Sequence, residues 1–92
     1  MAALSKDQVK IMKRCIGFKF KTIFQTKFIA KRNYFSYFWC NDIEEIKHWN
    51  DLCKQRLACF RQPEKTVPYY FLTNRGINKL EMYLGIQIKF KE

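Results

Sequence analysis

Glycine, proline and long apolar runs are scarce in this sequence, and each shortage narrows the possible functions. Three glycines and two prolines occur in 92 residues, and the glycines are isolated, so no glycine-rich loop can cradle a phosphate group. No run approaches the roughly 18 apolar residues of a membrane-spanning helix, and the first residues lack the apolar core of a secretion signal. The length is too small for a two-domain cofactor enzyme. We therefore expect one intracellular domain over residues 1–92.

Residues for catalysis or metal binding are equally scarce. His48 is the only histidine, and its spacing to the cysteines and carboxylates assembles no nucleophile with a base and an orienting acid. No two cysteines have the Cys-x-x-Cys spacing that is typical of zinc sites, so we expect four buried thiols. If the chain were secreted, the alternative would be two disulfides. The sequence predicts no enzymatic activity, no cofactor and no metal. The cysteines are Cys15, Cys40, Cys53 and Cys59.

Positive charge is abundant and unevenly distributed. The chain has 18 Lys and Arg against 8 Asp and Glu, a net charge of +10, while 48% hydrophobic and 17% aromatic content argues for a folded domain. Residues 1–41 hold nine cations and one acid, which gives +8, and residues 42–92 hold nine and seven, which gives +2. Such self-repelling charge indicates a polyanionic partner, although a merely solvated basic face is the alternative.

Local capping patterns predict three helices. Ser5 with Gln8 forms a capping box, and a glycine after the last apolar position is typical of a helix end. The other expected N-caps are the pairs Asn41-Asp42 and Thr73-Asn74. The predicted helices run from Ser5 to Gly17, from Asp42 to about Arg56 and from Thr73 to Gly85.

Alternation and β-favouring composition predict the strands between these helices. The first strand covers residues 18–21, and one or two strands lie within 23–39 with a bend near 31–33. A hairpin is formed by strands 57–60 and 67–72 around a turn at 62–65, and the last strand covers 86–91. The expected fold is α+β, with three helices and a four-stranded antiparallel sheet in the order α-β-α-β-β-α-β.

The candidate binding residues lie in the basic first half, where a series of cations runs without an intervening carboxylate. Lysine and arginine at this density are the usual phosphate contacts. The interleaved aromatic residues are expected mainly in the core, but the hydroxyls of Tyr34 and Tyr37 suit exposed rings that stack on bases. The predicted site comprises Lys13, Arg14, Lys19, Lys21, Lys27, Lys31, Arg32 and Tyr34.

Two stretches carry a resemblance to known proteins. The segment Arg32-Asn33-Tyr34-Phe35 and the later Tyr70-Phe71-Leu72-Thr73-Asn74-Arg75-Gly76 resemble a family of small phage and prophage proteins. Those proteins share a leading helix, an Arg-Asn-aromatic-Phe strand and a helix start with an aromatic-x-Thr-x-x-Gly pattern. One departure is Arg56-Leu57, where such proteins tend to have a glycine before the short strand at 57–60.

The size and element order are also similar to phage anti-CRISPR proteins that inhibit the type I-F surveillance complex. That resemblance implies a non-enzymatic inhibitor in the host bacterial cytoplasm. It would bind Cas subunits or guide RNA and block recruitment of target DNA, with no membrane partner. The main alternative is a small winged-helix-like DNA-binding regulator in which residues 63–65 form the wing. A nuclease is the third possibility, and acidic protein surface remains an alternative to RNA.

Overall fold

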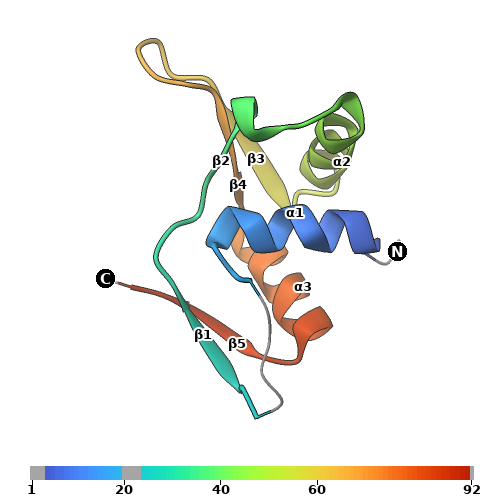
Figure 1. Ribbon diagram of the computed structural model, residues 1–92, viewed down its shortest axis with the longest axis vertical. Coiled ribbons are helices and arrows are strands. Elements are labelled where there is room, and N and C mark those ends of the chain that lie inside the picture. The colour runs from blue at the N-terminus through green and yellow to red at the C-terminus, as the bar shows by residue number, and fades with distance from the viewer. Residues whose placement is uncertain (1–3, 20–23, 92) are drawn as a thin grey trace.

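Three helices and five strands form a small α+β domain in the computed structural model, which describes residues 4–19 and 24–91 (Figure 1). Helix α1 crosses the middle of the molecule, with one sheet on each side of it. The elements are α1 (Lys6–Ile16), β1 (Lys27–Ala30), β2 (Phe35–Ser36), a 3₁₀ helix η1 (Tyr37–Trp39), α2 (Ile43–Lys54), β3 (Ala58–Arg61), β4 (Tyr69–Leu72), α3 (Asn74–Leu84) and β5 (Gln87–Phe90).

The helix ends confirm the capping predictions. Ser5 and Gln8 form the reciprocal capping box of α1, and Gly17 ends that helix with φ 77°. The side chain of Asp42 accepts a hydrogen bond from the Glu45 amide, and Thr73 caps α3 in the same way. These bonds satisfy N–H groups that have no partner inside the helix, which is why local sequence locates the boundaries so well.

The strands form two sheets, so the prediction of one four-stranded antiparallel sheet is not confirmed. Strands β2, β4 and β3 lie side by side in that order and pair antiparallel, whereas β1 pairs with β5 in parallel. Parallel strands need a long crossover, and here most of the domain separates the two strands in sequence. Alternation specifies which face of a strand is buried but not its partner. Phe18 and Lys19, which were expected in a strand, lie outside any strand.

A stack of aromatic rings forms the centre of the core. Trp49 of α2 lies parallel to Tyr70 of β4 with ring centroids 4.9 Å apart, and it contacts Phe35 of β2 at 5.3 Å. The expectation that the aromatic residues are mainly core is confirmed only in part for the phenylalanines, of which Phe28 is half-buried and packs against the core. Among the described phenylalanines only Phe18 and Phe35 are buried. Phe24 is 89% exposed and Phe38 is 74% exposed.

The junction between α2 and β3 depends on two unusual backbone positions. Arg56 has φ 64°, so this turn has the left-handed geometry that a glycine would adopt without strain. At the start of α3, Gly76 packs directly on the backbone of Leu57, and a Cβ added to Gly76 would lie 1.9 Å from the Leu57 carbonyl oxygen. The close approach of α3 to this junction therefore requires a glycine.

We expect Gly76→Ala to lower the free energy of unfolding by about 3 kcal/mol, because the backbone must move to admit the methyl group. Gly17→Ala is the matched comparison. It introduces left-handed strain without a backbone clash, so we expect a loss of about 1 kcal/mol. Urea denaturation followed by tryptophan fluorescence measures both losses. Equal losses in the two variants would contradict the close approach.

Candidate nucleic-acid interface

Asn33 anchors the segment that carries the predicted site. Its side-chain Nδ2 donates to the Leu72 carbonyl oxygen, and its Oδ1 accepts from the Leu72 amide, both at 2.9 Å. The Cys15 thiol donates to the same Oδ1 at 3.4 Å, and the Tyr34 amide donates to the Cys15 carbonyl at 3.2 Å. A side-chain amide thus bonds to β4 as a neighbouring strand would, and it fixes residues 31–34 against the end of α1.

Arg32 packs over the C-terminal end of α1. Its Nη2 donates at 2.8 Å to the Arg14 carbonyl oxygen at the end of the helix, which also accepts a longer bond of 3.3 Å from the Gly17 amide. Its guanidinium also lies 5.4 Å from the ring centre of Trp39 and 6.0 Å from that of Tyr34. The positive charge is therefore favoured both by the helix dipole and by two aromatic faces.

Three further cations lie near this turn. The Arg14 guanidinium pairs with Glu45 of α2 at 3.1 Å and lies 5.0 Å from the Phe35 ring. Lys13 lies over the Phe18 ring at 5.7 Å, and Lys19 is exposed. Arg14, Lys19, Arg32 and Trp39 border a shallow cleft of about 370 Å³. We call Lys13, Arg14, Lys19, Arg32, Tyr34 and Trp39 the arginine–aromatic surface.

The structure brings five of the eight predicted site residues to this surface, and Tyr34 is 44% exposed, as expected for a stacking ring. Lys31 is exposed directly before Arg32. Lys27 begins β1 and pairs in register with Gln87, whereas Arg32 follows the other end of that strand, so Lys27 lies outside the arginine–aromatic surface. Lys21 lies outside the described residues.

Trp39 is the functional candidate that sequence reasoning missed. The run from Tyr37 to Trp39 has strong β-propensity and was expected to be a strand. It forms a 3₁₀ turn instead, in which Ser36 accepts a bond from the Phe38 amide and acts as an N-cap. The serine before three aromatic residues was the available signal, since serine side chains often start such turns.

The thiols and the histidine take part in no disulfide and no metal-binding group in the described part of the chain. All four cysteines are free, and burial raises the pKa of Cys15 to about 12, which keeps it protonated. His48 Nε2 lies 3.8 Å from an Asp7 carboxylate oxygen. No three His, Cys, Asp or Glu side chains in residues 4–19 and 24–91 are grouped to hold a metal ion. Within those same ranges, no helix has the length and apolarity needed to cross a membrane.

Comparison with known proteins provides no relative from which a function could be inferred. No family model, no curated protein and no solved structure matches the chain. The function must therefore be argued from the geometry of the arginine–aromatic surface.

Replacing Asn33 tests the anchor of this surface. Asn33→Ala leaves both Leu72 backbone groups without their partner, so we expect a loss of about 3 kcal/mol in unfolding free energy. Asn33→Asp keeps an acceptor but has no donor for the Leu72 carbonyl, so it should not restore stability. Asn78→Ala, on the exposed face of α3, is the control and should change stability by less than about 0.5 kcal/mol. A tolerated Asn33→Ala variant would contradict the anchoring role.

Proposed function

We propose that the chain is a non-enzymatic binding protein whose arginine–aromatic surface binds single-stranded RNA in a nucleoprotein complex. The observation that carries the proposal is the stacking of Arg32 on Tyr34 and Trp39 beside Lys13, Arg14 and Lys19. Proteins that bind single strands combine cations for the phosphates with aromatic faces for the bases. A guanidinium has five N–H donors, so the bond from Arg32 to α1 leaves donors for a phosphate.

An unpaired strand suits this surface better than a duplex. The ring of Tyr34 is partly exposed and lies 5.3 Å from that of Trp39, so a base could stack only if it is not already stacked within a helix. Of the two arginines, Arg14 is already paired with Glu45, which places most of the free charge on Lys13, Lys19 and Arg32. The expected contact is therefore small, with a few phosphates and one or two bases.

The resemblance of Arg32–Phe35 to small phage proteins gives a more specific form of the proposal. In that form the chain is a phage inhibitor, the RNA is the guide RNA of a CRISPR surveillance complex, and occupation of the guide or of an adjacent Cas subunit blocks target DNA. The motif that carries the resemblance contains Arg32, Asn33 and Tyr34, the same residues that build and anchor the surface. The identity of the complex stays a prediction.

A winged-helix-like DNA-binding regulator is the second candidate, and the sheet favours it. The strand order β2-β4-β3, with α2 before β3 and a projecting hairpin between β3 and β4, resembles that of a winged helix and supports this candidate (Figure 1). However, α2 occupies the position of the recognition helix and begins with Asp42, Glu44 and Glu45. Three carboxylates at that end would be repelled by the phosphates of a duplex, which makes this candidate the weaker one.

Fluorescence anisotropy with labelled single-stranded RNA, repeated over a series of salt concentrations, tests the proposal. We expect Lys13→Ala with Lys19→Ala to weaken binding about tenfold and to reduce the log–log salt slope by about 1.4, because two phosphate contacts are lost. Lys47→Ala with Lys54→Ala on α2 removes the same charge elsewhere and should leave the slope nearly unchanged.

Two results would contradict this assignment. Equal losses in the two double variants would mean that only net charge matters. Tight binding of duplex DNA that is lost in Arg61→Ala with Lys65→Ala, at the hairpin, would instead favour the winged-helix candidate.

A further inference from the structure

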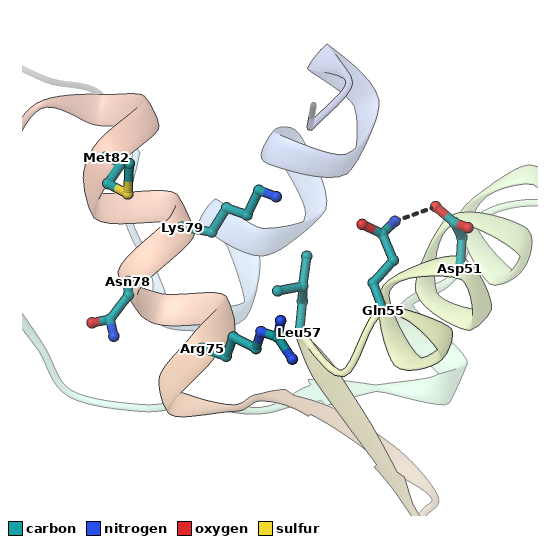
Figure 2. A pocket seen from close by; sticks show the side chains of 7 residues that line it. All are labelled: Asp51, Gln55, Leu57, Arg75, Asn78, Lys79 and Met82. Carbon is teal, nitrogen blue, oxygen red and sulfur yellow. Dashed lines mark hydrogen bonds between the residues drawn. The ribbon is translucent and has the colours of Figure 1, made fainter. Parts of the chain in front are cut away.

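A second concave site lies between α2 and α3, near the N-terminal half of α1 (Figure 2). Gln8 of α1 bonds to Asp51 on one wall of this site, whereas the arginine–aromatic surface surrounds the C-terminal end of α1 at Gly17. Nine residues of helix separate these positions by about 13 Å. The two sites are therefore distinct, and binding at the second does not require that the first binds RNA.

The site is a groove of about 640 Å³ with an apolar floor and a basic wall. Leu57 forms the floor and is only 3% exposed, and Met82 at the upper end is 84% exposed. Figure 2 shows Arg75 and Lys79 extending from α3 toward the wall formed by α2, and Gln55 and Asp51 on that opposite wall. We call these residues the α2–α3 groove.

Several bonds hold the groove in shape without a ligand. The Asp51 carboxylate accepts from Gln8 Nε2 at 2.7 Å and from Gln55 Nε2 at 2.8 Å, which ties the C-terminal end of α2 to α1. The Leu57 amide donates to the Leu52 carbonyl, and the Leu57 carbonyl accepts from the Thr73 amide. Because the floor of the groove is already ordered, binding of a partner would lose little conformational entropy there.

We propose that the α2–α3 groove binds an acidic peptide segment of a partner protein, with an apolar side chain seated over Leu57. Arg75 and Lys79 stand one helical turn apart on α3, so carboxylates spaced along the segment can face both of them. Met82 has a flexible, polarisable side chain that adapts to the apolar residue of the partner.

The charges of the groove favour a peptide over a nucleic acid. The Asp51 carboxylate lies on one wall and accepts bonds from the neutral amides of Gln8 and Gln55. A continuous phosphate backbone would lie close to this negative charge, whereas a peptide can place its carboxylates toward α3 and an uncharged face toward α2. The apolar floor also offers nothing to a phosphate, whose affinity comes from cations.

The probe for a binding experiment is a short fluorescein-labelled peptide in which glutamate and leucine recur at helical spacing. Its control carries glutamine at every glutamate position. We expect the acidic peptide to bind at least about tenfold more tightly than the control, and Arg75→Glu with Lys79→Glu to weaken it at least about tenfold. Arg75→Glu alone, at an exposed position, should show the same direction without any loss of fold, as a thermal melt checks.

A matched charge control makes the test specific. Lys65→Glu with Lys89→Glu changes the net charge equally at exposed positions outside the groove and should leave peptide affinity within about twofold. Equal weakening in both double variants, or equal binding of the acidic and glutamine peptides, would overturn the proposal. So would displacement of the peptide by single-stranded RNA together with loss of RNA binding in Arg75→Glu, since the groove would then be a nucleic-acid site.

Discussion

The side-chain amide of Asn33 fixes the position of residues 32–35 relative to β4. This position places Phe35 in the core and Arg32 on the binding surface. The paired bonds of Asn33 to the Leu72 backbone place Phe35 in the core, fully buried against Trp49, and leave Arg32 on the outside at the end of α1. A shift of one residue in an extended segment exchanges its two faces, so Phe35 would leave the core as Arg32 entered it. One polar side chain thereby couples the folding of the aromatic core to the placement of the arginine.

The dense positive charge of the first half is partly balanced within the molecule. Arg14 is neutralised by Glu45, and Arg32 is stabilised by a helix-end carbonyl and by two aromatic rings. These contacts reduce the rotamer freedom of the cations and set them at fixed distances before any partner arrives, which lowers the entropy lost on binding. The same contacts also reduce the charge that is free to attract phosphate. A bound RNA strand is therefore expected to contact the protein through only a few phosphates.

Local patterns in the sequence predicted most of the secondary structure, whereas long-range pairing and exposure did not follow from them. Ser5, Asp42 and Thr73 mark helix starts because a cap bonds only to the next few residues. The parallel pairing of β1 with β5 depends on contacts between distant segments, for which alternation contains no information. The α2–α3 groove also depends on contacts between distant segments, and the sequence did not predict it.

Residue-resolved NMR titration can locate single-stranded RNA at the C-terminal end of α1, where we propose that it binds. Titration of the isotope-labelled protein with a single-stranded RNA oligonucleotide should shift the amide signals of Arg14, Lys19 and Arg32 and the indole signal of Trp39, while those of the β3–β4 hairpin stay in place. Shifts confined to α2 and that hairpin, or none at concentrations well above the affinity seen by anisotropy, would contradict the account.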